Sequence, residues 1–583
     1  MSNLLIIAST SDNWQSACRL VNFLLREGGD VRWATAPFRA TGSDGCAQPY
    51  ACGSFLIVDA NTIPETVLGE AQQHFDIAAQ AVDEVMGFVG LQLRRVRIAM
   101  YGGGGAPFNH GRIFADLGFD VGFISPQEIR VGKLSDYDLF GMPGGGGLAM
   151  MGQMNPLGED GCRRIKDWVR CGGMYIGSCA GSFNAALVAD SFLEVCPQQR
   201  HLQMINARIW NRGDTEWIGL ESPGIGVVES RNLHPDHPVM FGLPDRFNIT
   251  HYNGPIFETV TKVLSDASVA RGLSALDGPA DDFTPSERFL SFSQTYDPEQ
   301  TLLGRAARED CYNIVSGHNG LGRVLLFGSH PEFGENLLMD DWGQPARMLA
   351  NAAFWQSGHL PESSPIRIKR EAGAAKAFPP GSGLRQISEA CARIESRVEQ
   401  LQGINDADMA WLAEDHAMSA FGLSGREIWR GGLRTFALLT ERMGEAVGRA
   451  EKLLDQAASL ESKAAGKPDL AARISHLIEM TLALDEALHH ETSAAWNQDF
   501  GYEGILQMLN RTEAMLQRAY DNINMDIAYS SNPYAYFDSS PYQLVVGSYL
   551  AATGVYLNSW QLLQMHLRLI EEQIFAVEIA LRA

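Results

Sequence analysis

The stretch formed by residues 172–183 constrains the fold of this chain more than any other. An apolar strand runs into a Gly-Ser-Cys-Ala-Gly turn, and an alanine-rich helix follows. The small residues Gly177, Ala180 and Gly181 permit a sharp turn between strand and helix. Such a turn lifts Cys179 clear of the sheet and places it at the beginning of a helix, where the helix dipole favours a thiolate. The pattern is typical of a nucleophile elbow, and a buried cysteine in an ordinary turn is the alternative.

Strands and helices alternate around this turn. The expected elements before it are a strand at 96–100, a helix at 111–117, strands at 121–124 and 137–142, and a helix at 161–171. This alternation predicts a parallel sheet with helices on both faces. Because the active sites of such sheets gather at the carboxyl ends of the strands, we expect the glycine runs at 102–105 and 144–147 to lie near Cys179.

The length of 583 residues predicts several domains. Residues 1–93 read as a small α/β segment that either packs against the next sheet or extends it, with a helix expected at 65–86, and residues 94–360 as the main α/β domain. Prolines and small residues at 361–383 predict a linker. Residues 384–583 have helical periodicity and predict an α-helical bundle, whose core seam is Leu384, Ile387, Cys391, Ile394, Val398 and Leu401.

The composition argues against several classes of partner and location. A net charge of −23 would repel phosphate backbones, so no nucleic-acid partner is expected. No apolar run of about 18 residues is present, and the first residues lack the pattern of a signal peptide, so we expect neither membrane insertion nor secretion. The nine cysteines form no C-x-x-C pair, which fits free thiols in a reducing compartment. The expected location is the cytoplasm.

A cysteine nucleophile needs a base, and the base needs an acceptor that orients it. His330 and Glu332 follow a firm apolar strand at 323–328, and Pro331 between them favours a bend that brings the carboxylate to the imidazole. Glu332 could instead cap a following helix. For an oxyanion hole, Ala180 offers one backbone N–H, and the glycine loop after Pro143, with Gly145 and Gly146, offers another.

These motifs resemble the class I glutamine amidotransferase superfamily. The likeness rests on a Pro-Gly-Gly loop, a G-x-C-x-G elbow and a His-Pro-Glu segment in this order, and it covers roughly residues 95–355. The chain is more similar to the branch that resembles the N-terminal domain of biotin-protein ligase, in which a Tyr/Gly-rich first loop and a Tyr-Asn-Gly-Pro segment recur. The resemblance implies a flavodoxin-like fold with Cys179 as nucleophile, His330 as base and Glu332 as orienting carboxylate.

The same resemblance implies which residues line the substrate site. They are Tyr101 and Gly103 in the first loop, Phe183 after the elbow, and Tyr252 and Asn253 before Gly254-Pro255, where an ordinary turn is the alternative reading of the last two. Glutamine-hydrolysing members carry Gln at the position of Phe183, and an aromatic ring cannot make the same polar contacts. A plain glutaminase is therefore not expected. No G-x-x-x-x-G-K-[ST] loop is present, and no cofactor is expected.

The remaining histidines predict no metal site. His110 reads as a solvated loop residue, and the pair His234 and His237 reads as a surface turn because no third ligand is in view. His489 and His490 are adjacent on a predicted helix, so their side chains point about 100° apart.

Two functions from different classes follow. The first is a cysteine-dependent hydrolase or amidotransferase-like enzyme, which forms a thioester with a small-molecule or peptide amide. The alternative is a ligand-binding or scaffold protein without turnover, whose helical domain recruits a partner protein or a second copy of the chain.

Overall fold

The computed structural model describes residues 4–58, 63–145, 149–209, 225–252, 254–279, 307, 311–334, 342–360, 382–404, 425–489, 504–522 and 548–582. Three of the sequence predictions, the oxyanion role of Gly146, the substrate contact of Asn253 and most of the linker at 361–383, lie outside these ranges.

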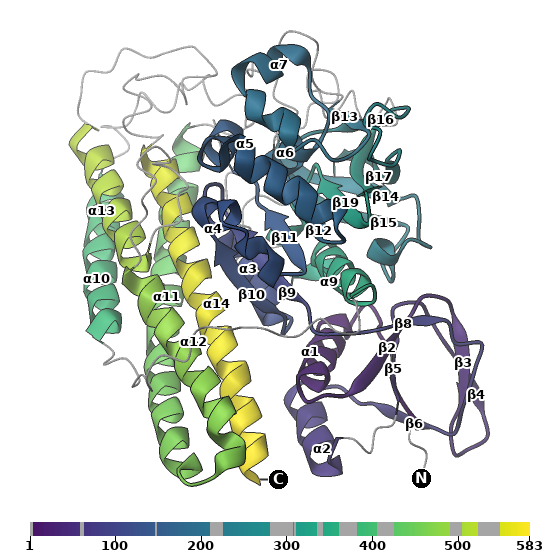
Figure 1. Cartoon of the computed structure of the whole chain (residues 1–583). Helices are drawn as coiled ribbons and strands as arrows, with labels where there is room; N and C mark the ends of the chain where they lie inside the picture. The colour runs from purple at the N-terminus through teal and green to yellow at the C-terminus, as the bar shows by residue number, and fades with distance from the viewer. Residues whose placement is uncertain are drawn as a thin grey trace.

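A mixed sheet forms the centre of the molecule (Figure 1). One half is parallel, with the order β10 (Asp120–Ile124), β9 (Arg97–Tyr101), β11 (Leu139–Met142), β12 (Met174–Ser178) and β19 (Gly322–Phe327). The other half is antiparallel and continues through β18 (Tyr312–Asn319), β17 (Arg271–Pro279), β14 (Ile225–Asn232) and β15 (Arg246–Tyr252). The short strands β13 (Ala207–Ile209) and β16 (Phe257–Thr259) pair beside it.

The expectation of a flavodoxin-like parallel sheet is therefore not confirmed, since only the strands from β10 to β19 pair in parallel. The physical reason is visible where β18 passes to β19. Asn319 pairs with Gly322, and Gly320 between them has φ 56°, so a two-residue hairpin joins the strands. A connection this short forces antiparallel pairing, whereas a parallel pair needs a crossover of a dozen or more residues.

Helices cover both faces of the parallel half because its strands alternate between two cores. Ala99, Tyr101 and Tyr175 share one hydrophobic cluster with Ile165 and Val169 of α5 (Ala149–Arg170). The intervening residues of β9 and β12 share the opposite cluster with α3 (Phe108–Asp116) and α9 (Gly343–Ser357). Smaller elements complete this part: α4 (Pro126–Arg130), η2 (Lys133–Asp136), α6 (Ala180–Ala185), α7 (Asp190–Val195), η3 (Pro197–His201), η4 (Pro238–Met240) and η5 (Pro331–Phe333).

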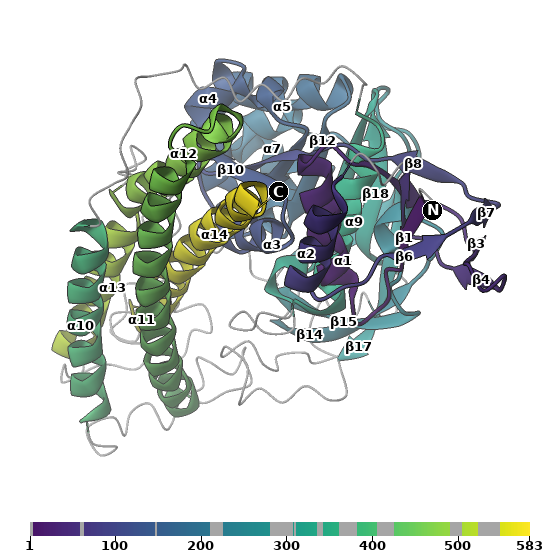
Figure 2. The ribbon, with the colours of Figure 1, turned by 90° about the horizontal axis from the view of Figure 1, so that it is seen from below.

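The N-terminal segment builds its own sheets and packs against the central domain, so of the two expected arrangements the extension of the central sheet is wrong. β6 (Gln80–Val82), β1 (Leu4–Ile7), β5 (Phe55–Val58), β2 (Asp30–Ala34) and β8 (Gly90–Gln92) form an antiparallel sheet, and β4 (Ala47–Tyr50), β3 (Phe38–Thr41) and β7 (Glu84–Met86) form a second. The first sheet contacts the rest through side chains, since Trp33 of β2 lies 6.1 Å, centroid to centroid, from Phe354 of α9. Figure 2 shows the first sheet beside α1 (Trp14–Arg26) and α2 (Glu65–His74), with the second sheet beyond it.

The helix expected at 65–86 ends at His74, and strands β6 and β7 follow it. Asp76, two residues later, has φ 50°. A non-glycine residue in this left-handed region cannot continue a right-handed helix, so the chain turns there.

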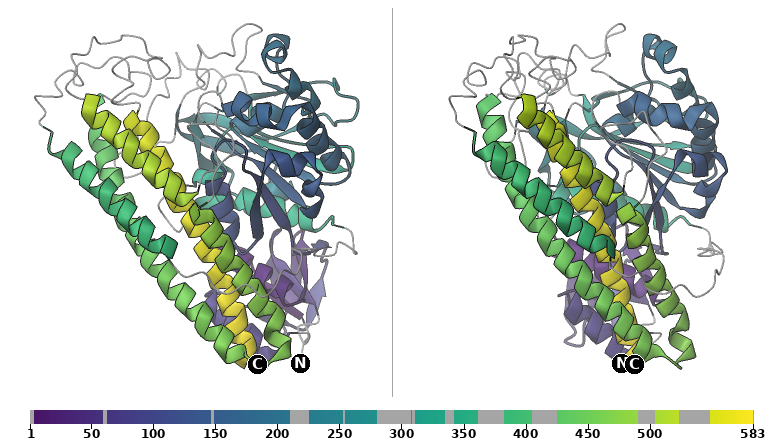
Figure 3. Two further views of the ribbon diagram at one scale, coloured as in Figure 1. Left: turned by 60° about the vertical axis from the view of Figure 1, so that its left-hand side comes forward. Right: turned by 90° about the vertical axis from the view of Figure 1, so that its left-hand side faces the viewer.

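The C-terminal region is helical and lies along one side of the α/β part (Figure 3). Its helices are α10 (Ser382–Gln402), α11 (Gly425–Ala464), α12 (Ala471–His489), α13 (Ile505–Asn522) and α14 (Ser548–Arg582), with η8 (Pro468–Leu470) before α12. All six residues of the predicted seam from Leu384 to Leu401 are buried, which confirms their role in core packing. In the described part of the chain, no helix combines the length and apolarity that a bilayer crossing requires.

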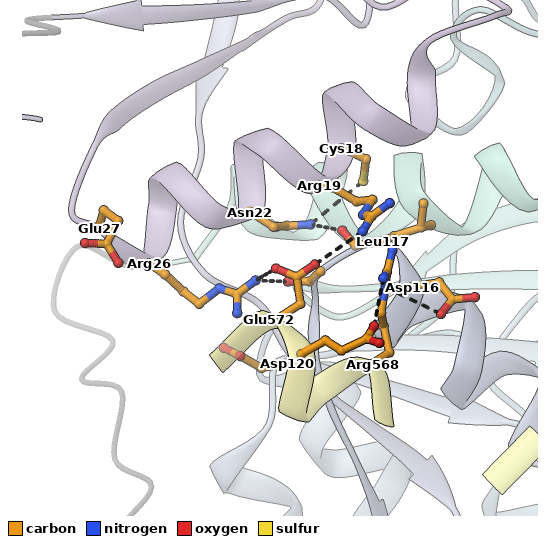
Figure 4. A network of polar contacts seen from close by, with 12 residues as sticks. Cys18, Arg19, Asn22, Arg26, Glu27, Asp116, Leu117, Asp120, Arg568 and Glu572 are labelled. Carbon is orange, nitrogen blue, oxygen red and sulfur yellow. Dashed lines mark hydrogen bonds and ion pairs between the residues drawn. The ribbon is translucent and has the colours of Figure 1, made fainter. Parts of the chain in front are cut away.

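Helix α14 connects the three parts of the molecule. Its Glu572 pairs with Arg19 and Arg26 of α1 (Figure 4). Its Phe575 stacks on His74 of α2 with ring centroids 3.8 Å apart. About two turns earlier, α14 packs along α3. The helical region therefore shares a core with the α/β part and is not attached by a linker alone.

Candidate active site

Cys179 sits in a strained turn between β12 and α6. Its φ of 49° and ψ of −113° are unusual for a residue with a Cβ. Strain of this kind costs about 1–3 kcal/mol and persists only where the surroundings enforce it. Here the Cys179 N–H donates to the Phe327 carbonyl at 3.0 Å, and the Tyr175 hydroxyl donates to the Gly181 carbonyl at 2.7 Å. The geometry is that of the elbow expected from the sequence.

The turn also requires glycine at position 181. A Cβ on Gly181 would overlap the carbonyl oxygen of Met142 in the neighbouring strand. We expect Gly181→Ala to lower the free energy of unfolding by about 3 kcal/mol, because the clash is with backbone that cannot yield. Gly444→Ala in α11 is the matched control, since nothing lies within 4 Å of its added Cβ. Alanine there should raise stability by about 0.5–1 kcal/mol. Urea unfolding of both variants checks the opposite signs, and equal effects would contradict this packing.

His330 and Glu332 lie together just after β19. The His330 N–H donates to the Thr250 carbonyl at 2.8 Å, and η5 begins at Pro331. The resulting turn brings His330 Nδ1 to 2.7 Å from Glu332 Oε1. The ring of Phe333 stacks on the imidazole, with centroids 4.5 Å apart and an interplanar angle of 4°. This arrangement orients His330 from two sides.

The other side of His330 lies beside Cys179, since a Cβ on Gly144 would touch both side chains, and the charge of the sulfur acts on the imidazole. Burial alone would lower the pKa of His330, but the charges of Glu332 and Cys179 and their hydrogen bonds outweigh it and raise the pKa to about 10. Burial likewise works against the charged form of Glu332, yet the neighbouring His110 and His330 hold the pKa of this carboxyl below its ordinary value. All three members are buried, with Cys179 at 6%, His330 at 3% and Glu332 at 2% exposure.

The glycine loop meets the site at Gly144, one residue earlier than expected. A Cβ on Gly144 would lie 2.7 Å from His330 Cε1 and 3.0 Å from Cys179 Cβ, so only glycine fits here. Gln153 Nε2 donates to the Pro143 carbonyl at 2.8 Å and fixes the loop. Gly145, which the sequence predicts in the oxyanion hole, directly follows Gly144. Ala180 begins α6, where the first N–H groups have no acceptor within the helix.

The residues expected to contact substrate are placed as follows. Tyr101 is fully buried, and its hydroxyl donates to the Gln153 carbonyl at 2.7 Å. Gly103 packs beneath the Tyr101 ring and Pro126. Phe183 is 7% exposed and belongs to the cluster between the sheet and α5. Tyr252 ends β15. The contact of each with a substrate stays a prediction.

The structure adds two residues to the candidate site that the sequence analysis does not predict there. His110 was expected to be a solvated loop residue, but it lies within α3, is 1% exposed, and places Nε2 3.5 Å from Glu332 Oε2. The signal was its place directly after a glycine loop at a strand end. Gly254 is the second: a Cβ there would lie 3.4 Å from the Cα of Cys179.

No metal centre is found within the described residues, where no three His, Cys, Asp or Glu side chains group suitably. His234 lies in a turn beside Arg271, with its Nδ1 2.6 Å from a guanidinium nitrogen of that arginine. His237 caps η4, where its ring accepts from the Val239 N–H at 3.3 Å. Both residues lie at a turn, as expected, but His237 is buried and not on the surface.

Comparison with known proteins adds one family match. Residues 134–205 match the family described as biotin-protein ligase, N terminal. This stretch includes the Pro143 loop and the Cys179 elbow, but it ends before His330 and Glu332. No curated protein sequence matches the chain.

Solved structures show only distant likeness. A cytoplasmic protein of Salmonella typhimurium shares 13% identity with a TM-score of 0.27, covering 45% of this chain and 98% of that one. A protein described as ThuA-like from Bacteroides uniformis shares 13% identity with a TM-score of 0.25, covering 45% of this chain and 90% of that one. A family 42 β-galactosidase shares 12% identity with a TM-score of 0.22, covering 47% of this chain and 32% of that one. These TM-scores are too low to indicate a common fold. The family match shows that, over residues 134–205, the chain is similar to the N-terminal part of biotin-protein ligases.

Proposed function

We propose that this protein is a cysteine-dependent hydrolase or amidotransferase-like enzyme that acts on an amide or related carbonyl. The observation that carries the proposal is the chain of contacts from a strained Cys179 to His330 and on to the buried Glu332. A nucleophile bonded to a base that is itself oriented by a carboxylate is the arrangement that acyl transfer requires. The resemblance to class I glutamine amidotransferases and their flavodoxin-like fold belongs to this proposal.

The proposed reaction has two steps. The Cys179 thiolate attacks the carbonyl carbon, and the imidazolium of His330 protonates the leaving amine as the C–N bond breaks and a thioester remains. A water molecule or another acceptor then attacks the thioester while neutral His330 takes its proton. The thiolate leaves, and the acid or the transferred acyl product is released. In both steps the Ala180 N–H and the glycine loop at Gly144 and Gly145 stabilise the oxyanion.

Phe183 limits which amides can serve as substrate. Phe183 replaces the polar side chain that a glutamine substrate would meet, so we propose an amide other than free glutamine. The second candidate is a non-catalytic ligand-binding or scaffold protein whose helices recruit a partner. The deep burial of all three site residues supports this second candidate, because a substrate has to reach the sulfur.

We also propose a cytoplasmic location. All nine cysteines lie within the described residues, and none is in a disulfide. Persistently reduced thiols fit a reducing compartment.

An activated ester separates the two candidates. We expect p-nitrophenyl acetate to acetylate Cys179, giving a burst of p-nitrophenolate and an acetyl mass on the Cys179 peptide. Cys179→Ala should abolish the burst, and His330→Ala should retain the acetyl group longer because deacylation lacks its base. Acetylation spread evenly over the nine cysteines would support the scaffold candidate.

A further inference from the structure

His110 lies between the two halves of the candidate site. Its Nε2 is 3.0 Å from the Oγ of Ser178, the residue before Cys179. The same nitrogen is 3.5 Å from Glu332 Oε2, on the turn after His330. One imidazole therefore contacts both the strand that presents the nucleophile and the turn that presents the carboxylate.

The carboxylate of Glu332 is held between two imidazoles. Its Oε1 is bonded to His330 Nδ1, and its Oε2 faces His110. A His110 ring without a proton on Nε2 would point a lone pair at this carboxylate, so the Nε2–H tautomer is favoured. Burial lowers the pKa of His110 despite the nearby Glu332, while His330 lowers it further. His110 is thus a neutral donor at pH 7.

The position of His110 is fixed from behind by α14. Gly111 packs against Met565, whose sulfur would lie 2.7 Å from an added Cβ. The fully buried guanidinium of Arg112 donates to Gln561 Oε1 at 3.1 Å and lies between two tryptophan rings, 4.8 Å from Trp342 and 4.5 Å from Trp560. These contacts of the two residues that follow His110 leave α3 little freedom to move His110 away from Glu332.

We propose that His110 is a positioning residue of the site: its Nε2, 3.0 Å from Ser178 Oγ and 3.5 Å from Glu332 Oε2, keeps the Glu332 carboxylate in the orientation that His330 needs, and α14 holds α3 in place behind it. A residue that merely filled the core would need no donor at this point, and a leucine would serve as well. The inference rests on the proposed function, since it assigns His110 to the same triad.

The test compares His110→Leu with His110→Gln. Glutamine keeps a neutral donor near the position of Nε2, and leucine removes it. Histidine NMR of the full chain follows the titration of the His330 ring, and iodoacetamide labelling follows Cys179 at pH 7. In H110L we expect the His330 midpoint to fall by about one pH unit and the labelling rate to fall about 10-fold. In H110Q the labelling rate should return to within about 3-fold of the wild type, and the His330 midpoint to within about 0.5 pH unit.

Each outcome has one meaning. Wild-type values in both variants, with Cys179 still the most reactive thiol, would overturn the role of His110 and leave the proposed function standing. A wild-type Cys179 that reacts no faster than exposed thiols would sink the proposed function, while the His330 titration still reports on His110. If H110L does not fold, His110→Asn replaces it, because its shorter amide stops before Oε2. Equal behaviour of H110N and H110Q would then overturn the proposal.

Discussion

Replacing His330 by alanine is expected to lower the rate at which iodoacetamide alkylates Cys179 at pH 7 by about 100-fold, the lower range of what a positioned base supplies. The pKa of about 10 at His330 means that a protonated imidazole stands beside the sulfur at neutral pH. A positive charge at that point favours the thiolate, which is the reactive form. Without it, the buried sulfur loses its counter-charge.

Two controls make this prediction specific. His201→Ala removes an imidazole of η3 that is 33% exposed and pairs with Glu159, and it should leave the rate unchanged. Glu332→Gln keeps the shape of the carboxylate but removes its charge, so we expect a smaller loss of about 10-fold. The rate is measured by mass spectrometry of the Cys179 peptide over time. A His330→Ala rate within twofold of wild type, with the fold intact, would remove the base from the account.

Replacing Glu572 by glutamine should lower the free energy of unfolding by about 2 kcal/mol. The Glu572 side chain is 3% exposed and lies 3.3 Å from Arg26 and 3.7 Å from Arg19 of α1 (Figure 4). Its removal leaves two cations without their partner between α1 and α14. The loss is smaller than for a fully buried pair, because both arginines reach solvent in part and Arg26 also donates to the Gly118 carbonyl.

The matched control is Glu578→Gln, six residues after Glu572 in α14. That side chain is 36% exposed and lies 4.0 Å from Arg582. Exposed pairs of this kind contribute little, so the change should stay below about 0.5 kcal/mol. Urea unfolding followed by tryptophan fluorescence compares the two. A smaller loss for Glu572→Gln than for Glu578→Gln would show that α14 is not held to the N-terminal segment in this way.

Much of the site could be predicted from local sequence. The elbow at Cys179 depends on small neighbours and on a strand that runs directly into a helix, and both are visible in twelve consecutive residues. His330 and Glu332 are two residues apart, so the proline between them was enough to suggest their contact. Side chains that meet through short segments leave readable patterns.

The rest depends on contacts between distant segments. His110 reaches Glu332 across 222 residues of sequence, and nothing in its neighbours says that α14 covers it. The sheet of residues 1–93 has strands as apolar as those of an extension of the central sheet, and only its antiparallel pairing with itself distinguishes the two. The Glu572 pair likewise joins chain segments more than 500 residues apart.

Competition labelling of the native protein tests the central claim most directly. With less iodoacetamide than protein at pH 7, Cys179 competes with the exposed thiols Cys46 and Cys171. Accessibility alone would favour those two, since Cys179 is 6% exposed. An activated nucleophile predicts that Cys179 is labelled first, by about 10-fold or more. Labelling of Cys46 and Cys171 first, with Cys179 modified only after unfolding, would contradict the account.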